Sequence, residues 1–222
     1  TGQDDFDLIQ VKLGRKGKLE AWVKDAGRGI AMRVASSSYI TMDGIVLSSR
    51  DNNYSSTYEQ GGLPAYVLES HHIAIKNAVL SNPNRYGNLH LLVMVRVSDS
   101  LVVDSEFYNF HRHAILTKPG TRVTIRRVYC NSRIGGLAGG YPTTRGTNGG
   151  DACVALYPCQ YCIIENTIAD GSPKASFLAE LNASGEVPLK GNKILGSIGY
   201  RSGNNGVYIN SRGSGLTMMP QD

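Results

Sequence analysis

The sequence has few of the features that mark several large classes of protein. Aromatic residues make up only 8% of its 222 residues, and no apolar stretch approaches the roughly 18 residues that a membrane-spanning helix needs. Helix-favouring runs are nearly absent, whereas 26 glycines supply turns. No basic and then apolar leader opens the sequence, so we expect any signal peptide to have been removed or never present. These absences favour one elongated, turn-rich, all-β domain.

Positive charge is in excess, but it is not concentrated in runs. The formal net charge is +5, which favours an acidic partner. There is no Lys/Arg run, no RNA-recognition motif and no helix that could enter a DNA groove. An acidic polysaccharide is therefore a better candidate partner than a nucleic acid.

A short phrase recurs along the chain. Each copy alternates apolar and polar residues, bends at a small or amide residue and ends in Ser, Asn or Asp, as in Ile-Thr-Met-Asp-Gly-Ile-Val-Leu-Ser at 40–48. Alternation with period two, closed by turn residues, predicts strands, and its recurrence predicts a repeat architecture. The copies lie at residues 40–48, 73–81, 101–109, 123–131 and 162–170, with a looser one at 187–196.

A second, short apolar strand precedes each copy and is joined to it by a polar turn such as Ser36-Ser37-Ser38. One unit is therefore strand, tight turn, strand and variable loop, with no helical pattern that would indicate a βαβ sheet. Units of this kind, stacked in register, form a parallel β-helix. The preceding strands are expected at residues 31–34, 66–68, 93–97, 114–116, 153–156 and 177–179.

This pattern resembles the right-handed β-helix superfamily that includes pectate lyases and related polysaccharide-degrading enzymes. The resemblance covers about residues 8–211 and is one of fold. It implies an all-β, right-handed, single-stranded parallel β-helix of about seven to eight rungs. Within a single domain, residues 1–30 would form an N-terminal rung or cap, 31–211 the repeated rungs and 212–222 a C-terminal tail.

Four cysteines fall close together in the second half of the chain. The Cys159-x-x-Cys162 spacing could indicate metal or redox chemistry, but these cysteines mostly replace apolar strand residues, which favours small buried side chains or disulfides between rungs. Two sequons, at Asn53 and Asn182, permit N-glycosylation. Together these features favour a secreted or cell-surface protein. The disulfide candidates are Cys130, Cys153, Cys159 and Cys162.

Two columns of polar residues have a structural explanation. The fourth position of the copies alternates in sign, which predicts a charge ladder between rungs that fixes their register. The last position predicts a ladder of hydrogen bonds at a bend. The fourth-position residues are Asp43, Lys76, Asp104, Arg126, Glu165 and Lys190, and the last-position residues are Ser48, Ser81, Asn109, Asn131 and Asp170.

The variable loops are expected to leave one edge of the stack, and each carries a cation and usually an aromatic residue. Arginine can bind a carboxylate or sulfate through two hydrogen bonds, and tyrosine can stack on a sugar ring. The alternative is that these side chains are simply solvated. The candidate substrate-binding residues are Arg50, Arg85, Tyr86, Arg133, Tyr141, Arg145 and Arg201.

The segment from Tyr108 to His113 is the richest candidate for catalysis. β-Elimination on a uronate needs a base and a group that neutralises the carboxylate. His111 or His113 could act as the base, Tyr108 as the acid and Arg112 as the carboxylate clamp. The alternatives are a solvated histidine pair and a Tyr108 that points into the core, because it aligns with Leu80.

Known catalytic motifs of this superfamily are not matched. Residues 149–156 look like the Gly-Asp-Asp-Cys stretch of polygalacturonases, but Ala152 replaces the second carboxylate and the companion motifs are missing. The motifs of chondroitinase- and alginate-type lyases are also missing. We expect no cofactor, since a Ca²⁺ site would need a carboxylate cluster that the sequence does not show.

Two functions remain open. The first is an extracellular protein that acts on or binds an acidic polysaccharide, with lyase-like cleavage of a uronate-containing glycan as the preferred reaction. The second is a non-catalytic structural or adhesive β-helix, such as a filament, sheath or fibre subunit. Leu216, Met218 and Met219 are apolar for a free tail, so either the chain is part of a longer polypeptide or its end rungs meet another subunit. We expect the open end rungs to contact another protein segment, giving an oligomer or filament.

Overall fold

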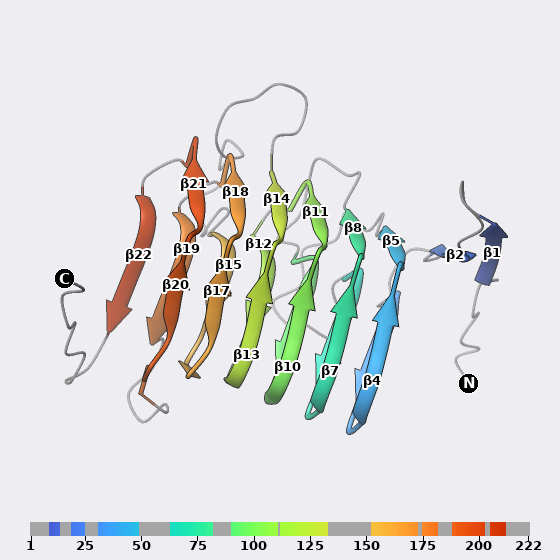
Figure 1. Cartoon of the computed structure of the whole chain (residues 1–222), viewed down its shortest axis with the longest axis horizontal. Helices are drawn as coiled ribbons and strands as arrows, with labels where there is room; N and C mark the ends of the chain where they lie inside the picture. Colours follow the sequence, from blue (N-terminus) through green and yellow to red (C-terminus); the bar gives the residue numbers. More distant parts are fainter. Residues whose placement is uncertain are drawn as a thin grey trace, which may run out of the picture.

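A computed structural model describes the chain as a stack of β-strands (Figure 1). The described residues are 9–13, 19–24, 31–48, 63–81, 90–110, 112–132, 152–172, 175–181, 188–202 and 205–211. Within these ranges there is no helix long and apolar enough to cross a membrane.

The strands form three sheets, which we call A, B and C. Sheet A contains β1 (Ile9–Leu13), β2 (Leu19–Lys24), β5 (Val46–Ser48), β8 (Val79–Ser81), β11 (Glu106–Tyr108), β14 (Tyr129–Asn131), β18 (Ile168–Asp170) and β21 (Ile198–Tyr200). Sheet B contains β3 (Met32–Ala35), β6 (Ala65–Leu68), β9 (Leu92–Val95), β12 (His113–Thr117), β15 (Ala152–Leu156), β19 (Ala175–Leu181) and β22 (Asn205–Ser211). Sheet C contains β4 (Ser38–Asp43), β7 (His71–Lys76), β10 (Val97–Val103), β13 (Gly120–Arg126), β16 (Cys159–Gln160), β17 (Ile163–Glu165) and β20 (Lys193–Leu195).

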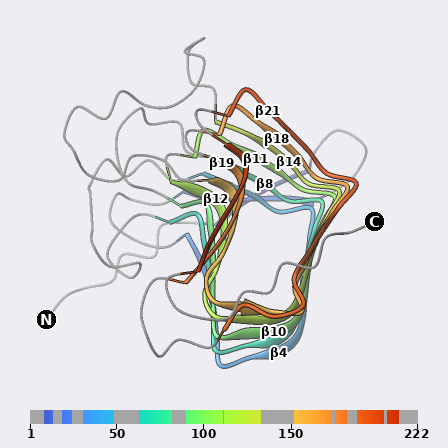
Figure 2. The same ribbon diagram turned by 90° about the vertical axis from the view of Figure 1, so that its left-hand side faces the viewer.

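The chain passes through sheets B, C and A in turn and then returns to sheet B one rung further along. Neighbouring strands from β3 to β22 pair in parallel, and only the β1–β2 hairpin is antiparallel. Viewed along the stack, the rungs superimpose as a tube (Figure 2). This arrangement confirms the parallel β-helix. The described strands make six complete rungs, from β3-β4-β5 to β19-β20-β21, and β22 begins another.

Each rung has three strands rather than the two read from the sequence. The recurring phrase contains two of them, because one residue in its middle has a positive φ and turns the chain from sheet C into sheet A. Glycine and asparagine reach this left-handed conformation at low cost, which explains the small and amide residues in the pattern. The residues at this bend are Gly44, Asn77, Asp104, Arg127, Asn166 and Gly196.

The register corrects the charge ladder at two positions. Lys76 pairs with Val103 rather than with Asp104, which lies at the bend, and Lys190 forms a bridge with Gln160. The third copy is displaced by one residue because Ser100 replaces the inward apolar residue that begins the other copies. The predicted neighbours Asp43 and Lys76 do pair in register, and Arg126 lies 3.9 Å from Glu165.

The same displacement affects the last position of the third copy. Phe107, not Tyr108, pairs with Leu80 and is fully buried. Tyr108 therefore takes the place predicted for Asn109 and is only half-buried, so the expectation that Tyr108 could point into the core was wrong.

Three of the ion pairs between the described rungs join residues with positive φ. Arg96 pairs with Glu69, Arg122 with Asp99, and Arg127 with Asp104, and all six have φ between 49° and 53°. The left-handed backbone breaks the strand alternation, and each pair joins one rung to the next. Solvent screens exposed pairs, so their main effect is to favour the correct register.

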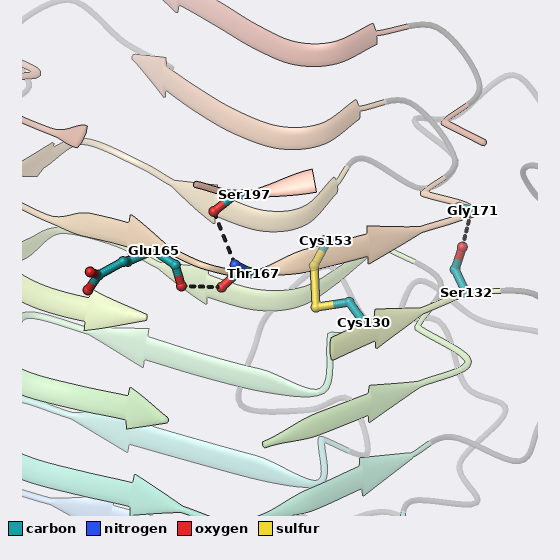
Figure 3. The surroundings of a disulfide bond; sticks show 7 residues. All are labelled: Cys130, Ser132, Cys153, Glu165, Thr167, Gly171 and Ser197. Carbon is teal, nitrogen blue, oxygen red and sulfur yellow. Dashed lines mark hydrogen bonds between the residues drawn. A yellow bond between two sulfur atoms is a disulfide. The ribbon is translucent and has the colours of Figure 1, made fainter. Parts of the chain in front are cut away.

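Hydroxyl groups at the corners satisfy the backbone where the strands end. Thr167 donates its hydroxyl to the Glu165 carbonyl at 3.1 Å, and its own N–H donates to the Ser197 hydroxyl of the next rung at 3.1 Å (Figure 3). Ser105 behaves in the same way: it donates to the Val103 carbonyl and accepts from the Ala78 N–H. These hydroxyls replace the ladder hydrogen bonds that a turn interrupts.

The interior of the tube is apolar, and sheet B is buried on its outer side as well. Inward residues such as Met94, Ile115 and Val154 form the main core. Outward residues such as Val93 and Leu116 are fully buried in a second cluster. Strands buried on both faces have continuous apolar sequences, which explains the unbroken runs that were read as strands.

A disulfide joins Cys130 of β14 to Cys153 of β15, two of the four candidate cysteines (Figure 3). It connects the last strand of one rung to the first strand of the next, and so fixes both ends of the longest connection between rungs. Closing a loop of this length stabilises the fold by about 3 kcal/mol in the chain-entropy model.

Candidate functional site

Side chains at the carboxyl ends of the sheet A strands form one column along the stack. In register from rung to rung, this column contains Ser48, Ser81, Tyr108, Asn131, Asp170 and Tyr200. From the third rung on, the column and its neighbours become aromatic and charged. We call this part the rim: Glu106, Tyr108, Tyr129, Asn131, Asp170, Tyr200 and Arg201.

Asp170 is the centre of the rim and is only 2% exposed. Its carboxylate accepts a hydrogen bond from Arg201 Nε at 2.7 Å and another from Arg201 Nη2. On the preceding rung, Tyr129 Oη donates to Oδ2 of Asp170 at 3.3 Å and Asn131 Nδ2 donates to the same oxygen at 3.0 Å. A buried carboxylate with this many donors is a fixed anchor for the side chains around it.

Tyrosine rings line the rim on both sides of Asp170. The Arg201 guanidinium lies over the Tyr200 ring, 4.5 Å from its centre. Tyr108 and Tyr129 lie on successive rungs with their ring centres 6.0 Å apart, and Tyr108 donates its hydroxyl to Glu106. The rim therefore presents aromatic rings beside carboxylate, amide and guanidinium groups that are already oriented.

These contacts set the ionisation of the rim. Burial raises the pKa of Tyr108 to about 12, with the Glu106 carboxylate acting in the same direction. Burial would also raise the pKa of Asp170, but the hydrogen bonds and charge of Arg201, with Tyr200 and Tyr129, outweigh it and the pKa is lowered. Near neutral pH the rim thus holds an ionised Asp170 and protonated Tyr108 and Tyr200.

Tyr108 and Arg201 are the two predicted site residues that the structure brings into this network. They lie three rungs apart and are linked through the two rungs between them. The Tyr108 ring contacts Tyr129, the Tyr129 hydroxyl donates to Asp170, and Arg201 binds Asp170.

The other described candidates lie at the start of β12. His113 is fully buried, with its Nδ1 2.9 Å from Nδ1 of His90, and the two rings are stacked 4.8 Å apart. The Tyr157 ring packs edge-on against His113. Arg112 is half-buried and its charge helps to lower the pKa of His90. A base enclosed in this way is poorly placed to reach a polymer, so we assign His113 no role in the rim.

The remaining candidates lie outside the described residues. They are the possible base His111, the loop residues Arg50, Arg85, Tyr86, Arg133, Tyr141 and Arg145, and the sequon residues Asn53 and Asn182.

Sequence reasoning missed Glu106 and Tyr129 and gave Asp170 only a structural role. A one-residue shift of the third copy would have placed Tyr108 in the same column as Asn131 and Asp170. Side chains alternate between the two faces of a strand, and Phe107 and Cys130 point inward. Their neighbours therefore lie on the outer side of sheet A: Glu106, Tyr108, Tyr129 and Asn131.

The structure describes no group of three or more His, Cys, Asp or Glu side chains that could hold a metal ion. Cys159 and Cys162 are free thiols buried in the core. Cys162 takes the corner position of Ser100: its thiol contacts the Gln160 carbonyl, as the Ser100 hydroxyl contacts the Ser98 carbonyl. Both thiols therefore have a structural role in the packed interior of the stack.

Comparisons with known proteins find similarity at the level of fold. No family model matches the chain, and no curated protein matches it. Among solved structures, a predicted glycosyl hydrolase from Parabacteroides merdae is 10% identical, with a TM-score of 0.38 over 75% of this chain and 79% of that one. The Streptococcus pneumoniae surface protein and adhesin PfbA is 11% identical, with a TM-score of 0.33, and the match covers 86% of this chain and 62% of PfbA. Similarities this distant assign no activity or ligand to the chain.

Proposed function

We propose that the protein binds an extended acidic polysaccharide along the rim. The observation that carries this proposal is the succession of Tyr108, Tyr129 and Tyr200 on the third, fourth and sixth rungs of sheet A, beside the hydrogen-bonding groups anchored on Asp170. Aromatic rings pack against the apolar faces of sugars, while carboxylate and guanidinium groups bind their hydroxyls in fixed directions.

The acidic character of the ligand is inferred from charge. The net charge of the chain is +5. In the sequence, Arg50 and Arg133 follow two residues after Ser48 and Asn131 of the rim column, and Arg85 follows four residues after Ser81. A polyanion would be drawn to a protein with this net positive charge, and these arginines follow the column closely in sequence.

We further propose that the protein acts outside the cell or at its surface. The Cys130–Cys153 disulfide supports this location, because such bonds form and persist mainly in oxidising compartments. Acidic polysaccharides of cell walls and matrices are also found there.

Binding to polygalacturonate, alginate and chondroitin sulfate, with neutral dextran as a comparison polymer, tests the proposal. Replacing Tyr108 and Tyr200 by Ala should weaken binding about tenfold, since each lost ring contact is worth about 0.5–1.5 kcal/mol. The matched control is Tyr161→Ala, because Tyr161 is 45% exposed but lies at the bend between β16 and β17, away from sheet A. Equal losses in the rim and control variants would reject the rim.

A second pair of variants tests the charge argument. Replacing Arg85, Arg112 and Arg145 together by Gln should weaken binding, and its salt dependence, more than replacing Lys76 and Lys190 by Gln. Equal losses per charge removed would mean that only the bulk charge of the protein matters.

Lyase-like cleavage of a uronate at the same surface is a second candidate function. It is favoured by the position of Tyr108 in the rim, where the residue is half-buried and its hydroxyl is already oriented by the Glu106 carboxylate, so it could serve as a proton donor. Incubation with each polymer should then produce ultraviolet absorbance from the unsaturated uronate product, and Tyr108→Phe should abolish it. Binding without this product would assign the protein to the non-catalytic class.

A further inference from the structure

Two exposed histidines lie side by side at the start of β7, away from the rim. His71 and His72 are adjacent in sequence, and their Nδ1 atoms are 2.8 Å apart. Neighbouring residues of a regular strand point to opposite faces of the sheet. His72 has a φ of 55°, and this left-handed residue breaks the alternation so that both imidazoles lie on the same side.

The surroundings hold these rings in place. The Tyr39 ring stacks on His72 at 4.6 Å and meets His71 edge-on at 5.8 Å. On the next rung, the pKa of the Asp99 carboxyl is lowered, mainly by the hydrogen bond from Arg122. His72 contributes to the same shift, which places the Asp99 carboxylate near the imidazole. Two imidazoles are thus held in contact at a surface that solvent reaches.

We propose that His71 and His72 together bind one divalent transition-metal ion through their Nδ1 atoms, with water in the remaining positions. In the metal-free protein one Nδ1 donates a hydrogen to the other. When the metal binds, that hydrogen moves through solvent to Nε2 of the same ring, so each Nδ1 presents a lone pair and neither ring changes its charge.

The separation of the two nitrogens favours Cu²⁺ over Zn²⁺. With metal–nitrogen distances of about 2.0–2.1 Å, two ligands at a right angle are about 2.8–3.0 Å apart, whereas two tetrahedral ligands are about 3.3–3.4 Å apart. The Nδ1 atoms are 2.8 Å apart in the metal-free hydrogen bond, so they already have the spacing of a right-angle site and would have to separate by about 0.5 Å to form a tetrahedral one. Cu²⁺ also binds imidazole more strongly than the other divalent metals of its row.

Titration of the whole chain with copper(II) chloride, in a buffer that does not bind copper, tests this proposal. Calorimetry should show one equivalent bound, and electron paramagnetic resonance should show coupling of the copper to nitrogen. His71→Ala and His72→Asn should each lower the affinity about tenfold or more, because a chelating pair loses its effective concentration. Asparagine is chosen at His72 because it tolerates positive φ.

Two controls keep the result interpretable. Lys76→Ala, on the same strand, should bind copper as the original protein does, and far-ultraviolet circular dichroism should show that all variants keep the β-helix. Zinc chloride should bind more weakly than copper by about tenfold or more. Unchanged copper binding in the His71→Ala/His72→Asn double variant, or tighter binding of zinc, would overturn the site or its geometry. The outcome does not depend on glycan binding, since the rim lies on another sheet.

Discussion

Individual residues show how this fold accommodates polar groups inside its walls. The buried His90–His113 pair is the clearest example, because its two Nδ1 atoms are 2.9 Å apart in an apolar setting. A contact of this kind requires one nitrogen to donate and the other to accept. Protonation of one ring would place a charge in the wall of the stack, and protonation of both would leave two donors facing each other.

We predict that acidification through the normal histidine range destabilises the protein. Burial, helped by the charge of Arg112, holds the pKa of His90 well below its usual value. Between that lowered value and about pH 6.5, the unfolded chain binds the proton that the folded protein does not, so stability falls as pH falls. The slope for one proton is at most about 1.4 kcal/mol per pH unit.

Urea denaturation at a series of pH values between 7.5 and 5.5 measures this slope. The His90→Gln variant is the comparison, since it carries no titrating group at this position. The slope should be smaller in the variant, and identical slopes would show that other groups cause the pH dependence.

At the scale of the element, the corner between sheets C and A depends on a repeated hydroxyl. Ser105 is 1% exposed, donates to the Val103 carbonyl at 2.8 Å and accepts from the Ala78 N–H at 3.1 Å. We predict that Ser105→Ala lowers the free energy of unfolding by about 1–3 kcal/mol, because it leaves a buried N–H without its acceptor.

Ser197→Ala provides a matched control for this prediction. Ser197 accepts from the Thr167 N–H at 3.1 Å and donates to the Leu195 carbonyl at 3.0 Å, but its side chain is half-exposed and water can replace it. Its loss should cost less than that of Ser105. Equal costs, measured by urea denaturation, would mean that the hydroxyl ladder acts independently of burial.

The repeated elements could be read from the sequence because each rung repeats the same physical constraints. Alternation, a bend at a small residue and a closing polar residue predicted the parallel β-helix. The three-strand rung was missed because the bend inside each phrase is a single residue. The third copy was misaligned because Ser100 and Ser105 resemble turn residues in sequence, while in the structure they are corner hydroxyls.

The rim was harder to predict because its members come from four rungs. Tyr129, Asp170 and Arg201 are separated by 41 and 31 residues but meet in one hydrogen-bonded group. Such contacts depend on the register between rungs, and an error of one residue moves a side chain to the opposite face. Tyr108 is an example: the sequence alignment placed it beside the inward Leu80, whereas in the structure it pairs with Ser81 in the outward column.

At the scale of the whole molecule, apolar columns of the core continue into an exposed rung. Val207 pairs with Phe177 and Ile209 with Ala179, yet they are 51% and 41% exposed. On sheet A, Ile198 is 57% exposed. This part of the stack presents both apolar side chains and a strand edge, which is the combination that promotes association.

We predict that the 222-residue chain associates through this rung in a concentration-dependent manner. Replacing Val207 and Ile209 by Lys should reduce the association measured by light scattering or sedimentation, because charges would have to be buried. Tyr161→Lys is the control, since Tyr161 is 45% exposed but lies between β16 and β17, two rungs before Val207 and Ile209. A monomer at every concentration would contradict the prediction.

The position of the disulfide has a mechanical consequence. Hydrogen bonds between rungs run along the axis of the stack, so tension applied along that axis would separate the rungs one after another from the ends. The Cys130–Cys153 bond encloses a sequence separation of 23 residues, or about 80 Å of extended chain, which stays out of reach of the force while the bond is intact. In a stretching experiment, adding a reductant should lengthen the fully extended molecule by that amount. The bond would thus limit the maximum extension of the protein under tension.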